Sequence, residues 1–450
     1  MKFRPPVLAG GVLALGGLLA VAPIVAQETR QAVQKVADTV AWRPTAIPDR
    51  IILTLTATPA ASQAVGWRTD NTVAAGKAFA QIVPAASYPK FTEKATQITA
   101  ETTPLVTNLG PAHYHNATFE GLKPGTLYAY RVGDGANWSE WNQFRTASEK
   151  PEPFSFIYFG DAQNDVKSMW SRAIRTAYSD APKARFMIHA GDLINVGDND
   201  ADWGEWHYAG GWVNGVVPSV ATPGNHEYGS LDRNRPKRQI TPHWRAQFAL
   251  PQNGPAGVEE SCYYLDYQNV RVISLNTEEL VPEQAAWLDR VLTENKSKWT
   301  VLTFHRPIFS TAKGRDNKAI RETWMPLFDK HKVDLVLQGH DHTYGRSRNI
   351  RAGVNVRDDE SGTVYVVSVS GPKMYELEKS DWIRRGAEDT QLYQIVHLDG
   401  DTLRYEARTV TGELYDAFEL QKQRSKVNRF VDRAPKTPER LRSSKNTETN

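Results

Sequence analysis

Five apolar segments after residue 153 each end at a side chain that can bind a metal ion. Segments of this length, apolar throughout, are typical of strands that helices cover on both faces. In such α/β sheets, ligands bind beyond the carboxyl ends of the strands. The pattern therefore predicts an α/β domain with a polar site along one sheet edge. The segments are FSFIYFG, RFMIHAG, SVATPG, KWTVLTFH and DLVLQG, and the side chains at or just beyond their ends are Asp161, Asp192, Asn225, His305, His340 and His342.

Amphipathic helices are expected between several of these strands. In the segment 165–180, apolar residues recur on one helical face, and similar stripes occur in 282–292 and 319–328. A strand, a helix and a second strand in that order indicate a βαβ unit with parallel strands. The segment 392–412 contains two strands around an Asp-Gly-Asp turn, which predicts a hairpin. We assign residues 154–421 to this α/β domain.

The preceding residues, 46–146, contain short strands and turns without a clear helical pattern. A Pro-Gly turn comes just before an alternating strand that contains Tyr128 and Tyr130. Leu122, Pro124, Thr126 and Tyr128 together resemble the tyrosine corner of fibronectin-type sandwiches, in which the phenol bonds back to the backbone. An all-β sandwich is therefore expected here, joined to the α/β domain by the polar linker 147–153.

The two ends of the chain differ in character. Lys2 and Arg4 precede an uncharged apolar run, 7–26, so residues 1–26 resemble a secretory signal peptide. An uncleaved membrane anchor is the alternative, because twenty apolar residues can just cross a bilayer. Either predicts a secreted or periplasmic protein.

At the other end, residues 422–450 hold nine Lys and Arg against three Asp and Glu. This tail carries +6 of a total net charge of +3, so the rest of the chain carries −3. A solvated, mobile polar tail is the simpler interpretation of such a charge run. We therefore expect no nucleic-acid partner.

The side chains at the strand ends form a coherent ligand set. Carboxylates, one amide oxygen and imidazoles suit borderline or hard divalent cations such as zinc, manganese or iron. The alternative for His340 and His342 is a surface loop that happens to contain two imidazoles. Packing alone would accept Ser, Thr or Asn at all five strand ends, so we favour metal binding. If one carboxylate is shared, the set can hold two divalent ions, which can clamp a phosphoryl group and activate water.

The motifs GDAQ, GDLIN, GNHE, FHRP and GHDH, in this order, resemble those of calcineurin-like metallophosphoesterases. Together with the sandwich and the sequence GHDHTYGRS, they resemble purple acid phosphatases in particular. This resemblance implies a four-layer catalytic domain of two mixed sheets flanked by helices. It also implies hydrolysis of phosphate monoesters in a small substrate, by attack of a metal-bridging hydroxide on phosphorus.

The resemblance also implies roles for matching residues. Asp161, Asp192 and His342 would bind the first metal, and Asp192 would bridge to the second. Asn225, His305 and His340 would complete the second site. His226, from GNHE, would be the catalytic side chain that donates to the phosphate or to the leaving oxygen.

Two positions depart from the family patterns. Purple acid phosphatases have a metal-binding tyrosine where this chain has Asn195, so we predict divalent occupancy and a colourless protein, which an absorption spectrum would test. The wider superfamily often has a histidine at the position of Gln163. Gln163 and Asn195 are therefore candidates either for weak ligation through an amide oxygen or for a place just behind the ligands.

Other side chains near the motifs are candidates for substrate binding. They are Glu227, Tyr228, Arg306 and His207. For His207 the alternative is a helix that packs Trp203, Trp206 and His207 onto the core, because these residues are spaced i, i+3, i+4. Asp341 is expected to be an exposed spacer, His189 a core residue, and His113 and His115 surface residues.

Other functions share the same ligand set. A phosphodiesterase, or a nucleotide or pyrophosphate hydrolase, would differ only in the walls of its pocket. From a different class, an inactive cell-surface binding protein would use the sandwich for recognition. The complete set of six donors argues against that alternative, since an inactive site has no reason to keep all of them.

Overall fold

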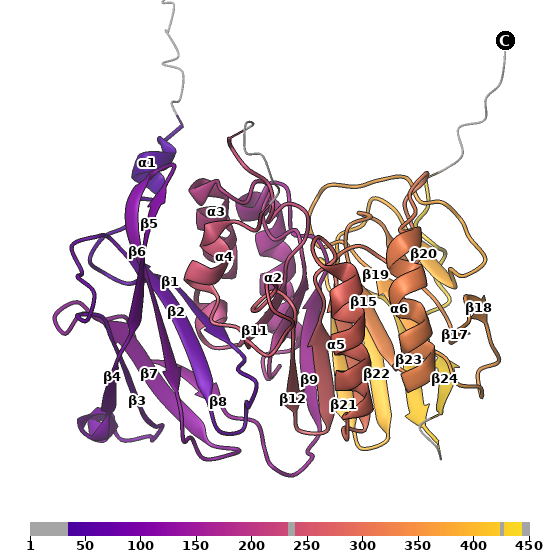
Figure 1. Ribbon diagram of the computed structural model, residues 1–450, viewed down its shortest axis with the longest axis horizontal. Coiled ribbons are helices and arrows are strands. Elements are labelled where there is room, and N and C mark those ends of the chain that lie inside the picture. The colour runs from indigo at the N-terminus through magenta and orange to yellow at the C-terminus, as the bar shows by residue number, and fades with distance from the viewer. Residues whose placement is uncertain (1–34, 233–238, 424–426, 443–450) are drawn as a thin grey trace, which may run out of the picture. The chain divides into compact units, whose positions relative to one another are not determined.

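The computed structural model describes residues 35–232, 239–423 and 427–442 (Figure 1). The predicted signal or anchor segment, 1–26, lies outside these ranges. Among the residues described, we find no helix with both the length and the apolarity needed to cross a bilayer. The chain forms a β-rich N-terminal domain followed by an α/β domain, as the sequence predicts.

Two groups of antiparallel strands pack face to face in the N-terminal domain. Val65 and Trp67 alternate along one strand, and they share a buried core with Tyr130 of the opposite group. The Tyr128 hydroxyl accepts a hydrogen bond from the Lys123 N–H at 2.9 Å, the contact expected of a tyrosine corner. One group is β1 (Asp49–Thr54), β2 (Gln63–Thr69), β6 (Gly110–Phe119) and β5 (Glu101–Thr107), and the other is β4 (Thr96–Thr99), β3 (Phe79–Pro84), β7 (Leu127–Gly133) and β8 (Asn142–Arg145).

Two mixed sheets form the centre of the α/β domain. The larger one has eleven strands in the order β24-β23-β22-β21-β9-β10-β11-β1-β2-β6-β5, and the smaller has seven in the order β12-β13-β14-β15-β19-β16-β20. The new strands of the larger sheet are β9 (Phe154–Phe159), β10 (Met187–Ala190), β11 (Ser219–Thr222), β21 (Leu392–Asp399), β22 (Thr402–Thr409), β23 (Leu414–Lys422) and β24 (Asn428–Asp432). Those of the smaller sheet are β12 (Tyr263–Tyr267), β13 (Val270–Ser274), β14 (Trp299–Phe304), β15 (Leu335–Gln338), β16 (Tyr344–Arg346), β19 (Val364–Val367) and β20 (Arg385–Ala387), with β17 (Ile350–Arg351) and β18 (Val354–Asn355) as a separate hairpin.

Helices cover the outer faces, which gives the predicted four layers. Because side chains alternate along a strand, Val301 and Leu335 face the larger sheet, whereas Leu302 and Val336 face the helices. Figure 1 shows α5 and α6 next to each other on that helical side. The helices are α1 (Asp38–Ala41), α2 (Ser171–Asp180), α3 (Asp200–Gly210), α4 (Pro242–Gln247), α5 (Val281–Thr293) and α6 (Lys318–His331), with short turns η1 (Pro89–Lys94), η2 (Val166–Trp170) and η3 (Gly211–Gly215).

One sheet runs through both domains, which the sequence analysis did not predict. β1 pairs in parallel with β11 through Thr54 and Ser219, and the Leu55 N–H donates to the Ser219 carbonyl at 3.2 Å. The sandwich therefore extends the sheet of the α/β domain. Pairing between strands about 165 residues apart leaves no local pattern in the sequence.

The basic tail is also partly structured, in contrast to the expectation for residues 422–450. β24 lies within this segment and pairs antiparallel with β23. The side chain of Phe430 is buried against Phe418. Farther along, Arg440 bridges to Ala387. The segment is highly charged, and its one large buried apolar side chain, Phe430, is not apparent from composition. Composition alone therefore predicted a solvated tail.

A buried ionic cluster joins the two domains at the start of α3. The carboxylate of Asp200 accepts from Arg50 Nη1 at 2.7 Å and from Arg68 Nη1 at 3.0 Å. It also accepts from the Tyr114 hydroxyl at 3.0 Å. Burial alone would raise the pKa of Asp200, but His243 and the two guanidinium groups hold it well below its usual range. The N-terminus of α3 is thereby fixed to β1, β2 and β6.

We predict that Asp200→Ala lowers the free energy of unfolding by about 3–5 kcal/mol, because it leaves the buried Arg50 guanidinium without a counter-charge and Arg68 with Asp49 as its one remaining carboxylate partner. Urea denaturation measures this loss. Asp359→Ala is the matched control, since Asp359 forms an exposed pair with Arg357 and its removal should change nothing measurable. A loss no larger than that of the control would show that the cluster does not stabilise the fold.

Candidate metal centre

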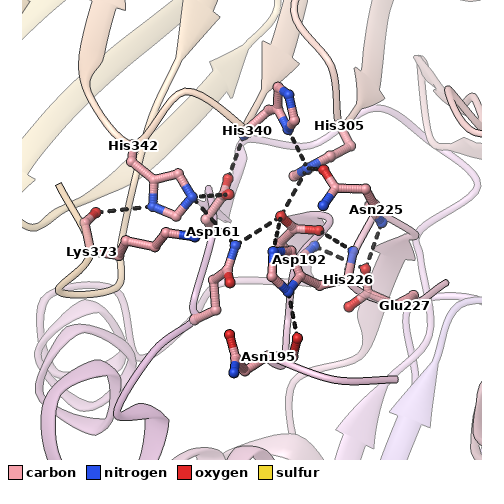
Figure 2. Close-up of polar contacts among 12 residues, drawn as sticks. Asp161, Asp192, Asn195, Asn225, His226, Glu227, His305, His340, His342 and Lys373 are labelled. Atoms are coloured by element: carbon pink, nitrogen blue, oxygen red, sulfur yellow. Dashed lines mark hydrogen bonds and ion pairs between the residues drawn. The ribbon is translucent and has the colours of Figure 1, made fainter. Parts of the chain in front are cut away.

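The six predicted donors lie beyond the carboxyl ends of strands in the two facing sheets. Asp161, Asp192 and Asn225 follow the parallel strands β9, β10 and β11 of the larger sheet. His305 follows β14, and His340 and His342 follow its parallel neighbour β15. Parallel strands end at the same edge, so these turns meet in one place (Figure 2).

The turns that carry the donors are sharply bent. Asp192, His340 and His342 all have positive φ, at 50°, 77° and 48°. A residue with a side chain held in this region costs roughly 1–3 kcal/mol, and such positions cluster at functional sites. Gly224 allows the closest approach, because a Cβ added there would lie 2.3 Å from Asp192 Oδ1.

A first group of donors consists of Asp161, Asp192 and His342. His342 Nε2 lies 3.2 Å from Asp161 Oδ2. The side-chain amide of Gln163 also belongs here, since its Nε2 lies 2.9 Å from Asp192 Oδ2 and 3.3 Å from His342 Nε2.

A second group consists of Asp192, His305 and His340, with Asn225 beside them. His305 Nε2 lies 3.1 Å from Asp192 Oδ2 and 3.2 Å from Asn225 Oδ1. His340 Nδ1 lies 3.1 Å from His305 Nε2. Two ligands bound to one ion at about 2.1 Å are separated by about 3.0–3.4 Å in octahedral or tetrahedral geometry. Each group therefore has the spacing of a single coordination sphere, and Asp192 Oδ2 belongs to both.

Backbone carbonyls orient two of the imidazoles. His305 Nδ1–H donates to the Ala190 carbonyl at 2.9 Å, and His342 Nδ1–H donates to the Lys373 carbonyl at 3.0 Å. A carbonyl can only accept, so these bonds place the proton on Nδ1. The Nε2 lone pairs are left facing the donor groups, as ligation requires.

Glu227 and Asp341 hold the ligand turns from behind. Glu227 is fully buried and accepts from the backbone N–H groups of Asp192 and Leu193, at 3.0 and 2.8 Å. Burial, then the neighbouring Asp192, raises the pKa of Glu227 to about 8. Asp341 is also fully buried, so the expectation of an exposed spacer is wrong. Its carboxylate accepts from the Thr311 N–H at 2.7 Å.

The electrostatics of the site favour positive charge at its centre. Burial alone would lower the pKa of His305, but the carboxylates of Asp192 and Asp161 raise it to about 10. Burial raises the pKa of Asp161 to about 7 and lowers that of His342 to about 3. A neutral imidazole is the form that binds a metal, so a cation bound between these carboxylates would take the place of the second proton on His305.

Two buried oxygens in the first group lack a hydrogen-bond donor among the described residues. They are Asp161 Oδ2 and Gln163 Oε1. Buried acceptors are normally satisfied, and a bound ion is one accepted explanation for an exception. A bound cation would satisfy both oxygens, the Gln163 amide by a flip of its oxygen and nitrogen. The residues present therefore fit a pair of divalent cations.

Other predicted residues lie around the donor groups rather than in them. The Asn195 side chain is exposed and accepts from Asn164 at 2.7 Å, while its carbonyl accepts from His226 Nδ1–H. Arg306 forms an ion pair with Glu278 at 2.6 Å, and its Nη1 lies 3.0 Å from His340 Nε2.

Two of the residues predicted to bind substrate use their polar atoms within the protein. Tyr228 is buried, and its hydroxyl accepts from Asn276 Nδ2 at 2.7 Å. His207 is buried on α3, with Nε2 3.0 Å from Gln247 Oε1, in agreement with the helix-packing alternative.

Among the remaining histidines, His189 is buried against Phe159, as expected. His115 is buried between Thr69 and Thr102, so its prediction as a surface residue is wrong.

The sequence motifs do not point to Lys373, although its carbonyl orients His342. It follows the apolar segment TVYVVSVSG, which contains β19 and ends at the same edge. The rule applied to the other strand ends selects side chains that can bind a metal ion, so it does not select a lysine.

Two family models match this chain. Residues 48–146 match the purple acid phosphatase N-terminal domain family, and residues 155–344 match the calcineurin-like phosphoesterase family. The chain is 27% identical to mouse acid phosphatase type 7 over 267 residues, which cover 52% of this chain and 57% of that protein. It is 27% identical to Arabidopsis thaliana purple acid phosphatase 21 over 266 residues, which cover 57% and 58%.

A solved structure supports the fold independently. Purple acid phosphatase PPD1 from yellow lupin (Lupinus luteus) seeds aligns with a TM-score of 0.70 and 19% sequence identity, covering 83% of this chain and 74% of that one. The chain spans less than two thirds of the length of the two curated relatives.

We predict that the full-length chain binds two divalent ions, and that Asp192→Ala binds neither tightly, because Asp192 Oδ2 belongs to both donor groups. His342→Ala and His305→Ala should each retain one ion. Elemental analysis after dialysis against zinc or manganese measures the stoichiometry. His397→Ala, at a half-buried position on β21, is the control and should retain two. Two ions in His305→Ala would remove His305 from the ligand set.

Proposed function

The chain belongs to the calcineurin-like phosphoesterases, with a purple acid phosphatase N-terminal domain in front of the catalytic one, and we propose that it is a metal-dependent hydrolase of phosphate monoesters. The observation that carries this proposal is the sharing of Asp192 Oδ2 between two donor groups of matching spacing. Such an arrangement suits two cations close enough to act on one phosphoryl group.

In this proposal Asp161, Asp192 and His342 hold one cation, with the Gln163 amide oxygen as a further donor. Asn225, His305 and His340 hold the second together with Asp192. Zinc, manganese and ferrous iron all suit these nitrogen and oxygen donors. When bound, the two ions supply the charge that lowers the pKa of water and neutralises the phosphoryl oxygens.

His226 is placed to deliver a proton. Its backbone N–H donates to Asp192 Oδ1 at 2.8 Å, which fixes the residue beside the shared carboxylate. Its Nδ1–H donates to the Asn195 carbonyl. Its Nε2 faces the donor groups, 3.8 Å from Asp192 Oδ2, and its side chain is 24% exposed. A proton held at Nε2 can therefore pass to the oxygen that leaves phosphorus.

The proposal is tested with p-nitrophenyl phosphate and bis-p-nitrophenyl phosphate, with and without chelator and added metals. We expect faster hydrolysis of the monoester, loss of activity with chelator, and activity reduced by at least about 10² in Asp192→Asn and His305→Ala. Faster hydrolysis of the diester would favour a phosphodiesterase, and exclusive turnover of nucleotides or pyrophosphate would favour that class. Absence of turnover under every metal condition would favour an inactive binding protein.

A second prediction concerns His226. Loss of a general acid typically costs 10²–10⁴ in rate, and the cost is larger when the leaving group is poor. We therefore expect His226→Ala to slow phenyl phosphate hydrolysis at least about tenfold more than 2,4-dinitrophenyl phosphate hydrolysis. The comparison of kcat values for the two esters measures this difference. Equal losses for both esters would assign His226 to phosphate binding instead.

A further inference from the structure

The loop after β19 is fixed against the first donor group. The backbone N–H groups of Ser370 and Gly371 both donate to the Asp161 carbonyl, at 3.0 and 2.6 Å. A Cβ added at Gly371 would lie only 2.2 Å from the Gln163 carbonyl oxygen, so the two turns touch through a glycine. The start of the loop is therefore held by the same turn that presents Asp161.

Two further contacts fix the next residues of this loop to His342. The Lys373 carbonyl accepts from His342 Nδ1–H at 3.0 Å, and the Tyr375 N–H donates to the His342 carbonyl at 3.1 Å. The rings of His342 and Tyr375 are 4.6 Å apart between centroids. The backbone of Lys373 thus has a defined position beside a predicted metal ligand.

The Lys373 ammonium makes no hydrogen bond or ion pair with any residue that the structure describes. Figure 2 shows its side chain running beside the His342 ring towards Asp161. Its Nζ lies 5.6 Å from the centre of the Tyr375 ring. Lys373 is half-buried, so this charge is at the border of the site rather than fully in solvent.

The guanidinium groups of the neighbouring Arg306 and Arg315, by contrast, already have partners within the protein. Arg306 binds Glu278 through two nitrogens, at 2.6 and 3.1 Å. Arg315 donates to the His340 carbonyl at 3.0 Å, and its guanidinium lies over the Tyr375 ring. Both groups support the fold of the ligand turns, whereas the three N–H donors of the Lys373 ammonium are available to a ligand.

We propose that Lys373 is a specificity-determining residue whose ammonium binds a non-bridging phosphate oxygen of the substrate and so favours doubly charged phosphates, that is, monoesters over diesters. This inference rests on the proposed function and names the group that sets its substrate preference. A phosphate monoester carries nearly two negative charges at neutral pH, because its second pKa is about 6. A diester carries one. Since Coulomb attraction scales with charge, a single ammonium near the phosphoryl group stabilises the monoester more.

The test compares the full-length, metal-loaded protein with Lys373→Met, Lys373→Arg and the control Lys379→Met. Lys379 lies on the same stretch of chain but is 73% exposed and paired with Glu439. Two measurements are made: kcat/KM for p-nitrophenyl phosphate and bis-p-nitrophenyl phosphate, and the Kd for inorganic phosphate by calorimetry.

We expect Lys373→Met to lower kcat/KM about tenfold for the monoester, mainly through KM, and less than about threefold for the diester. The Kd for phosphate should rise about tenfold. Lys373→Arg should recover most of both losses, and Lys379→Met should match the wild type. Equal losses for the two esters, or an unchanged Kd for phosphate, would overturn the inference.

The proposed function and this inference can fail separately. If the wild type hydrolyses neither ester, the proposed function fails, but the phosphate titration still decides the role of Lys373. If the monoester is hydrolysed and Lys373→Met behaves like Lys379→Met, the proposed function stands and the role of Lys373 is rejected.

Discussion

A single buried carboxylate, that of Asp192, is the constraint on which the rest of the site depends. A buried charge without compensation is costly, and here histidines, an amide and the backbone N–H of His226 converge on it. Its Oδ1 accepts from the His226 backbone and its Oδ2 faces both donor groups. The left-handed backbone at Asp192 and the glycine at 224 bring these partners within reach. The backbone geometry around Asp192 and the charge of its carboxylate therefore both place the metal centre at this residue.

Much of this centre could be predicted from the sequence because each donor follows a strand that is recognisable by its composition. Asp161 and His305, for example, come at the ends of apolar runs, and parallel strands bring such ends together. The surrounding contacts could not be predicted in this way. Asp341 looks like a spacer between two histidines, and only the folded loop at Thr311 supplies the N–H group that allows its burial. The burial of His115 could not be predicted either, because its hydrogen-bond partners Thr69 and Thr102 lie on other strands.

The relation between the domains shows the same limit. Composition divides the chain correctly into a β-rich part and an α/β part, but it treats them as separate units. The pairing of β1 with β11, and the contacts of Asp200 with Arg50 and Arg68, join them into one framework. Asp202, in the first turn of α3, accepts from the Val196 N–H in the segment after Asp192. The N-terminal domain therefore holds the helix that supports a ligand turn.

The short strand β24 has a different consequence, which concerns association with other chains. The edge strand of an open sheet exposes a row of unpaired N–H and C=O groups. A long exposed edge of this kind can pair with strands of other chains. β24 has only five residues and places Arg429 and Asp432 around the buried Phe430. β24 thus covers the edge of β23 with a strand that is too short and too charged to pair readily with another chain. A segment that looks like a solvated tail in the sequence therefore protects the folded chain from aggregation.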